Sequence, residues 1–149
     1  MKKLLLMTAL MMLCSISSIN AFTSCEGGTI ITRNKYTDAK APAGCDETTC
    51  PATTKTFCKS NGTMNWWSAL TWCDAQGGNL ATFREMCPGV APASNNVEGA
   101  CPALQGTVQG QWSWSGYPID NKNVLDVSLY SGAVIIYGIN NVNHMALCE

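Results

Sequence analysis

Charged side chains are scarce in this chain: they make up 13% of its 149 residues, and there is only one histidine. The basic residues form no patch or run, which argues against nucleic acid and anionic membranes as partners. After residue 21, no apolar run is long enough to cross a bilayer, so we expect no membrane insertion of that part. Asn, Ser, Thr and Gly are abundant instead, and such residues are common on polar binding surfaces.

Motifs of catalysis and metal binding are also missing. No Gly-rich phosphate loop follows a strand-like run, and the C-x₂-C spacing of zinc sites is absent. The histidine, His144, lies in an Asn-rich stretch, and we interpret it as a surface residue beside a strand. Four carboxylates could form a glycosidase pair, but nothing in the sequence indicates that any two face each other. They are Glu85, Glu98, Asp120 and Asp126. We therefore predict no catalytic residue, no metal site and no cofactor.

The first 21 residues have the pattern of a secretory signal peptide. Lys2 and Lys3 form a basic start, residues 4–13 form a short apolar run, and Ala21 suits the last position before cleavage. The alternative interpretation of these residues, a buried N-terminal helix, fits the basic start less well. A signal this short and basic is typical of bacteria. The mature chain would have 128 residues, enough for one domain, and a net charge of −3. We expect it in the periplasm, on the cell surface or outside the cell.

Cysteine is the unusual component of the mature chain. Eight cysteines remain after the signal is removed, at positions 25, 45, 50, 58, 73, 87, 101 and 148. An even number in an exported chain indicates disulfides, although spacing alone cannot choose among roughly a hundred pairings. Nearness along the chain suggests three pairs and leaves a fourth. The four are Cys25–Cys58, Cys45–Cys50, Cys87–Cys101 and Cys73–Cys148.

Turn residues and apolar spacing predict an α+β order of elements. A short strand at 29–32 is followed by a Thr- and Pro-rich loop over 37–56. Asn65 is a good N-cap for an amphipathic helix whose apolar residues recur at 66, 69, 70 and 73, and Gly77 or Gly78 ends it. Thr82 and Glu85 form a capping box, which predicts a second short helix.

The second half of the chain has the pattern of β structure. Residues 124–130 alternate apolar and polar side chains, Ser131-Gly132 is a turn signal, and residues 134–137 form the return strand. Residues 145–148 form the closing strand. A strand, two helices and then a hairpin-bearing antiparallel sheet predict an α+β domain.

In combination, these motifs resemble the C-type lectin-like domain family. The spacing Trp66-x₂-Ala69-x₃-Cys73-x₃-Gly77-Gly78-x-Leu80 is similar to the first-helix motif of that family. Residues 112–116 resemble its tryptophan-bearing central strand, and residues 146–149 resemble its last strand. The resemblance covers residues 58–149 and implies a C-type lectin-like fold whose helix cysteine pairs with the last-strand cysteine. Residues 22–57 then correspond to the N-terminal hairpin of the longer form with a disulfide-held insertion.

The chain departs from this family where calcium and sugar are bound. Trp112 and Cys148 are only 36 positions apart, so the long calcium- and sugar-binding loop is shortened or lost. The triplets Glu-Pro-Asn, Gln-Pro-Asp and Trp-Asn-Asp are absent. Because Ca²⁺ needs six to eight clustered oxygen ligands and Asp120 and Asp126 stand alone, we expect no calcium-dependent sugar binding.

Two groups of residues are candidates for ligand binding. Trp112, Trp114 and Tyr117 lie close together: exposed, they would form an aromatic platform for a sugar or a protein, and buried they would be core. Asn140, Asn141, Asn143 and His144 form a polar loop that could make adaptable hydrogen bonds or could be a solvated turn. The Asn-rich tail also resembles the variable regions that diversity-generating retroelements produce in bacterial proteins of this fold.

The sequence therefore predicts an exported binding or adhesion module. Its ligand would be a protein or glycan on another cell, a host or a phage, bound without calcium. A structural or assembly subunit of a bacterial surface appendage is the alternative, and a hydrolase comes third.

Overall fold

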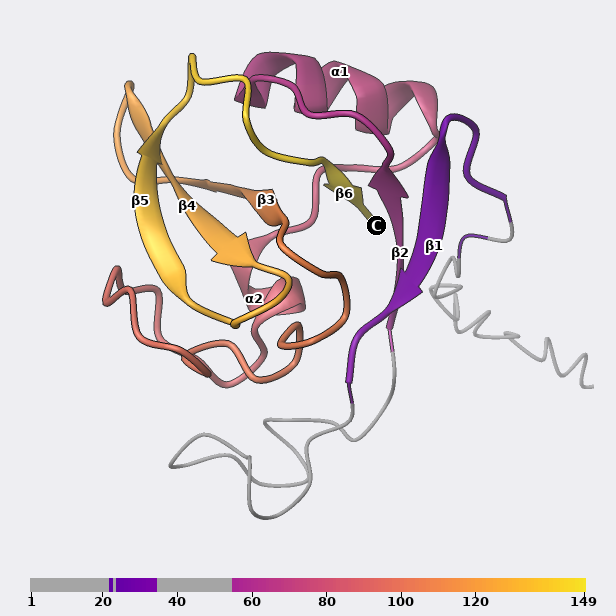
Figure 1. The fold of residues 1–149 in the computed structure, drawn as a ribbon. Helices are drawn as coiled ribbons and strands as arrows, with labels where there is room; N and C mark the ends of the chain where they lie inside the picture. The colour runs from indigo at the N-terminus through magenta and orange to yellow at the C-terminus, as the bar shows by residue number, and fades with distance from the viewer. Residues whose placement is uncertain (1–21, 23, 35–54) are drawn as a thin grey trace, which may run out of the picture.

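The computed structural model describes residues 22, 24–34 and 55–149 of the chain. This part has a small α+β fold with two helices and two three-stranded antiparallel sheets, which lie beside each other in Figure 1. The first sheet has the order β1 (Gly28–Thr32), β2 (Thr56–Ser60), β6 (Leu147–Cys148). The second has the order β3 (Trp112–Pro118), β4 (Asn123–Ser128), β5 (Val134–Gly138). The predicted signal peptide and the predicted Cys45–Cys50 disulfide lie outside the described residues.

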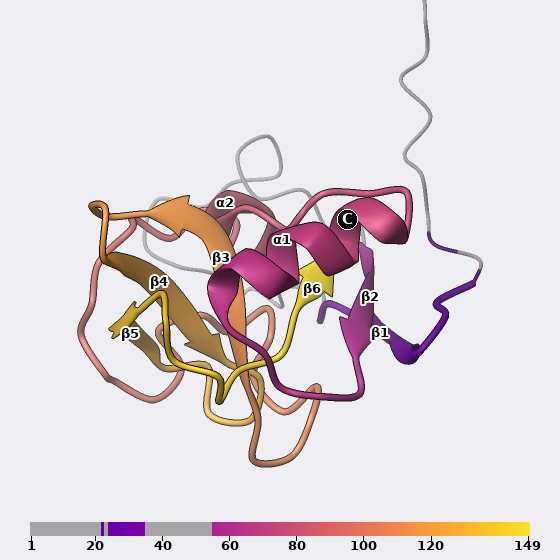
Figure 2. The same cartoon turned by 90° about the horizontal axis from the view of Figure 1, so that it is seen from above.

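The C-terminal segment connects the two sheets. Within it, β6 pairs with β2, and Cys148 also bridges to Leu80 on its other side. Met145 makes a parallel bridge to Ser113 of β3. Figure 2 shows this segment passing between the sheets beneath helix α1 (Trp66–Ala75). The last residues of the chain are buried and therefore central to the fold. Of the predicted closing strand over 145–148, Leu147 and Cys148 form a strand.

Helix α1 forms where the capping and spacing signals predict it. The side chain of Asn65 accepts a hydrogen bond of 2.8 Å from the Ser68 amide, which satisfies one of the free N–H groups at the helix start. Trp66, Ala69 and Cys73 are the buried stripe of the helix. Gly77 then adopts φ +78°, a left-handed conformation that glycine takes without steric cost, and the chain reverses there.

Helix α2 (Phe83–Met86) is a single turn that the predicted capping box holds in place. The Glu85 amide donates to Thr82 Oγ1 at 3.4 Å, and the Thr82 amide donates to Glu85 Oε2 at 2.9 Å. So short a helix is not stable through its own hydrogen bonds. Its stability comes from burial of Phe83 and Met86 in the core and from the disulfide at the next residue, Cys87.

Three of the four predicted disulfides lie in the described part of the chain, and all three are formed. Cys25–Cys58 joins the segment before β1 to β2, Cys73–Cys148 joins α1 to β6, and Cys87–Cys101 closes the loop after α2. Disulfides of this kind persist in oxidising compartments, so they indicate an extracytoplasmic environment. No helix among the described residues has the length and apolarity to cross a membrane.

The second sheet differs from the alternating pattern in one respect. Strand β4 lies between β3 and β5, and residues 124–129 are all buried, including the polar Asp126 and Ser128. The apolar–polar alternation therefore does not correspond to a buried face and a solvated face, because both faces of β4 are covered.

Candidate ligand-binding surface

The three aromatic residues predicted from the Trp-Ser-Trp stretch lie in different environments. Trp114 is fully buried, and its Nε1 donates to the Met64 carbonyl at 2.6 Å. Trp112 is only partly buried, and Tyr117, at the other end of β3, is 43% exposed. Trp114 is thus core, so Trp112 and Trp114 do not form an exposed platform. Tyr117 contributes to a separate pocket.

His144 is a buried residue, which corrects its interpretation as a surface histidine. Its side chain is 5% exposed, and its Nδ1 lies 2.7 Å from Oδ2 of the fully buried Asp126. The imidazole packs on the rings of Tyr137 and Trp114, with centroids 4.4 Å and 4.6 Å away. Burial raises the pKa of Asp126 to about 6, and the neighbouring His144 partly opposes this shift. Sequence alone missed this contact because the two residues belong to different elements.

The Asn-rich loop lies on the surface, directly beside the start of α1. Asn140, Asn141 and Asn143 are exposed, whereas His144 anchors the end of the loop inside. The Met64 amide donates to the His144 carbonyl at 2.9 Å. Two residues later, at the start of α1, the Trp66 amide donates to the Ile139 carbonyl at 3.1 Å. Figure 1 shows this loop, in yellow, next to the first turn of the helix.

The outer face of α1 carries an aromatic hollow that the sequence analysis did not propose as a site. It has a volume of about 500 Å³ and is lined by Met64, Trp67, Ser68, Thr71 and Trp72. Trp67 is 55% exposed, and its ring meets the Trp66 ring edge-on with centroids 4.9 Å apart. The sequence held one signal for this hollow: Trp67 and Trp72 cannot both belong to the buried stripe at 66, 69 and 73.

The hollow and the loop meet at Met64. Met64 lines the hollow and is also bonded through its backbone to the end of the Asn-rich loop. We call the two together the α1–loop surface. It consists of Met64, Trp67, Ser68, Thr71, Trp72, Asn140, Asn141 and Asn143. The surface combines exposed indole with hydroxyl and amide groups that can both donate and accept hydrogen bonds.

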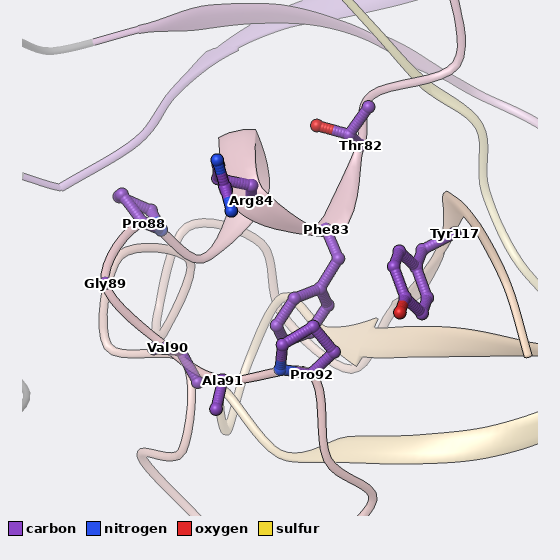
Figure 3. A pocket seen from close by; sticks show the side chains of 9 residues that line it. All are labelled: Thr82, Phe83, Arg84, Pro88, Gly89, Val90, Ala91, Pro92 and Tyr117. Atoms are coloured by element: carbon purple, nitrogen blue, oxygen red, sulfur yellow. The ribbon is translucent and has the colours of Figure 1, made fainter.

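A second hollow, beside α2, contains the predicted residue Tyr117. It has a volume of about 880 Å³, and its walls are α2, the loop that follows it and the end of β3. Figure 3 shows Phe83 and Pro92 in its centre, with Tyr117 on one side and Arg84 on the other. The pocket is mainly apolar, and Arg84 is the one charged residue that lines it among the residues the structure describes.

Glu85 faces the carboxylate of Glu149, a residue outside the four carboxylates considered from the sequence. Lys55 Nζ lies 2.8 Å from Glu85 Oε1 and also pairs with the Glu149 side chain. Burial alone would raise the pKa of Glu85, but hydrogen bonds with Glu149, Lys55 and Thr82 outweigh it and lower that pKa to about 2. Burial and the hydrogen bond with Glu85 raise the pKa of Glu149 to about 7, against the opposing effect of Lys55.

This Lys55–Glu85–Glu149 cluster lies outside both hollows. None of its three members lines the α1 hollow or the pocket beside α2. Both carboxylates are held by the same ammonium group, so their visible role is to fix the chain end against β2 and α2. Glu98 and Asp120, two more of the carboxylates considered for a glycosidase pair, contact residues close to them in the sequence. Glu98 accepts from Gln105 at 3.4 Å, and Asp120 accepts from the Lys122 and Asn123 amides.

Among the described residues, no group of three or more His, Cys, Asp or Glu side chains could hold a metal ion. Comparison with known proteins adds no further assignment. No protein-family model matches the chain, and no curated protein sequence matches it. Any function must therefore be argued from the α1–loop surface and the pocket beside α2.

Proposed function

We propose that this chain is an exported binding module of the C-type lectin-like kind that recognises a protein or glycan without calcium. Two covalent features support the fold assignment: α1 is joined to the last strand by Cys73–Cys148, and the N-terminal hairpin is closed by Cys25–Cys58. Both pairs are those that the family resemblance implies. The observation that carries the functional proposal is the exposed Trp67 within the α1–loop surface.

An exposed tryptophan on a rigid helix favours binding. Tryptophan offers a large apolar face with few rotatable bonds, and it is enriched where binding energy is concentrated. The hollow places Trp67 beside the half-buried Trp72 and the side chains of Ser68 and Thr71. An indole face can stack on the apolar face of a sugar or hold an apolar side chain, while nearby hydroxyls and amides orient polar groups.

The scaffold under this surface is pre-organised. The Cys73–Cys148 disulfide holds α1 to β6, and the buried His144 holds the end of the Asn-rich loop against β4. A surface that is already ordered loses little conformational entropy when a ligand binds, so more of the contact energy appears as affinity.

Calcium has no evident place in this proposal. Asp120 is exposed and accepts hydrogen bonds from its own turn, whereas Asp126 is buried against His144. Among the described residues, neither carboxylate belongs to a cluster of acidic side chains that could supply the oxygen ligands Ca²⁺ requires.

The alternative, a structural subunit, has less support from the sheet edges. Assembly by strand addition needs an edge with free backbone groups. On β5, the Ile136 amide donates to Ser94 Oγ at 3.1 Å, and the Asn96 amide donates to the Val134 carbonyl at 2.9 Å. The loop around residues 94–96 therefore occupies part of this edge.

The test is a binding screen of the mature protein on glycan arrays and intact cells, in buffer that contains a chelator. We expect saturable binding that Trp67→Ala reduces at least about tenfold, since truncating a central aromatic contact costs about 2 kcal/mol or more. Tyr130→Ala is the matched control, because Tyr130 is 52% exposed and lies away from the α1–loop surface. Equal loss in both variants, or self-assembly with no ligand bound, would overturn the proposal.

A further inference from the structure

The pocket beside α2 is built as a preformed apolar cavity. Phe83 is almost fully buried and supplies its floor, and Pro88, Val90 and Pro92 supply apolar walls. Two backbone hydrogen bonds fix the start of the loop that follows α2. The Cys87 amide donates to the Phe83 carbonyl at 2.8 Å, and the Val90 amide donates to the Cys87 carbonyl at 3.2 Å. Cys87 is also tied to Cys101 by a disulfide. A volume of about 880 Å³ is in the size range of sites for small molecules.

Two polar groups in this pocket have no partner within the described chain. The guanidinium of Arg84 makes no hydrogen bond or ion pair with a described residue, and neither does the hydroxyl of Tyr117. Glu85 is next to Arg84 in the sequence but is occupied by Lys55 and Thr82. The pocket therefore offers one uncompensated positive charge and one free hydroxyl above an apolar floor.

The positions of these groups define the shape of the ligand. In Figure 3, Arg84 and Tyr117 stand on opposite sides of the pocket, with Phe83 and Pro92 between them. A ligand that spans the pocket needs a negative group beside Arg84 and an apolar or aromatic body over Phe83 and Pro92. A carboxylate suits a guanidinium because the two can form parallel charge-assisted hydrogen bonds.

We infer that the pocket beside α2 binds a carboxylic acid with an apolar body, such as an aryl-alkanoic acid. Its carboxylate pairs with Arg84, and its body lies on Phe83 and Pro92 and reaches the ring of Tyr117. The same chemistry occurs in a free acid and in the carboxyl end of a peptide with a hydrophobic last residue. This site is separate from the α1–loop surface, so it stands independently of the function proposed there.

The inference is tested by titrating isotope-labelled mature protein with 4-phenylbutyrate and following the backbone amide signals by NMR. We expect saturable shifts confined to residues 83–92 and 117, with a dissociation constant on the order of a millimolar or tighter. The uncharged amide of the same acid should bind at least about tenfold more weakly, since it cannot make the charge-assisted pair. No saturable shift up to about 10 mM, or equal binding of acid and amide, would overturn the inference.

Variants of exposed residues locate the site without threatening the fold. Arg84→Gln should weaken binding of 4-phenylbutyrate at least about tenfold, and Arg84→Lys should retain part of the affinity. Lys122→Gln removes an exposed positive charge elsewhere and should change nothing. Trp67→Ala should also leave this binding intact, which separates this site from the α1–loop surface. If Lys122→Gln weakens binding as much as Arg84→Gln, the attraction is non-specific and the inference is wrong.

A final arm distinguishes the two sources of the carboxylate. A short peptide that ends in Phe with a free carboxyl group is compared with the same peptide amidated. Tighter binding of the acid peptide than of 4-phenylbutyrate assigns the pocket to protein carboxyl ends, and the reverse order assigns it to free acids. Either order sustains the carboxylate site, provided that the amidated peptide is the weaker of the two peptides.

Discussion

Asp126 is a carboxylate with no solvent exposure, and its close ionisable neighbour is His144. Burial raises its pKa from 3.8 to about 6. The folded protein therefore binds this proton more tightly than the unfolded chain does. By linkage, this contribution to stability is present below about pH 4 and is lost as the pH rises to about 6, with a size on the order of 2–3 kcal/mol.

The variant Asp126→Asn tests this directly. Asparagine has nearly the same shape but does not titrate, so the part of the stability decline that Asp126 causes should disappear. Urea unfolding at several pH values between 4 and 7 measures the effect, and Asp120→Asn, at an exposed carboxylate, should keep the decline. Glu149 also has a raised pKa and titrates in the same direction in both proteins. An unchanged slope in Asp126→Asn would show that the burial of this pair has been misjudged.

For individual residues, solvent exposure of the side chain is the property that the sequence predicts least well. The buried positions of Trp66 and Cys73 follow from their helical spacing and are confirmed. The burial of His144 does not follow from its polar neighbours, because it depends on Asp126 and on rings contributed by β3 and β5. The exposure of Trp67 depends on which segments leave the outer face of α1 uncovered, and no local pattern records that.

Among the elements, both helices could be predicted because their signals are local. Asn65 and Gly77 bound α1, and Thr82 with Glu85 begins α2, each through hydrogen bonds or dihedral angles of neighbouring residues. The division into two sheets could not be predicted. It depends on the C-terminal segment pairing with β2 and with Leu80 over long stretches of sequence.

Strand β3 provides a test of one such long-range contact. Its Gly116 amide donates to the Ala81 carbonyl at 2.8 Å, and a Cβ at Gly116 would lie 2.7 Å from the Leu80 carbonyl oxygen. Because backbone atoms cannot move aside cheaply, Gly116→Ala should destabilise the fold by about 1–3 kcal/mol. Chemical denaturation measures this change.

Gly62→Ala is the matched control for that substitution. A Cβ at Gly62 meets no atom within 4 Å, so the variant should unfold within about 0.5 kcal/mol of the parent. If Gly116→Ala is as stable as Gly62→Ala, β3 does not approach residues 80–81 as closely as described.

For the whole molecule, the longest covalent closure is Cys73–Cys148, which spans 75 positions. In the chain-entropy model, such a closure stabilises the fold by about 4 kcal/mol. Cys73→Ser and Cys148→Ser each remove the same bond, so we expect equal losses, and the double variant should lose no more than either. Denaturant unfolding measures these losses, and peptide mapping without reduction checks the pairing. A different partner for Cys73 would overturn the covalent scheme.

The shorter Cys87–Cys101 closure is the internal comparison. It spans 14 positions and should contribute about 3 kcal/mol to the stability of the fold, less than the Cys73–Cys148 disulfide. A larger loss from Cys87→Ser than from Cys73→Ser would mean that strain or packing at the loop, rather than chain entropy, dominates these contributions.

At this largest scale, the central claim is that a disulfide-stapled scaffold presents the α1–loop surface to a ligand. The most direct measurement is an NMR footprint of a ligand identified on the arrays, recorded on the labelled mature protein in chelator. The account predicts that amide signals shift at residues 64–72 and 140–143 and that they do so without calcium. A footprint that leaves both segments unchanged, or that arises only when calcium is added, would contradict it.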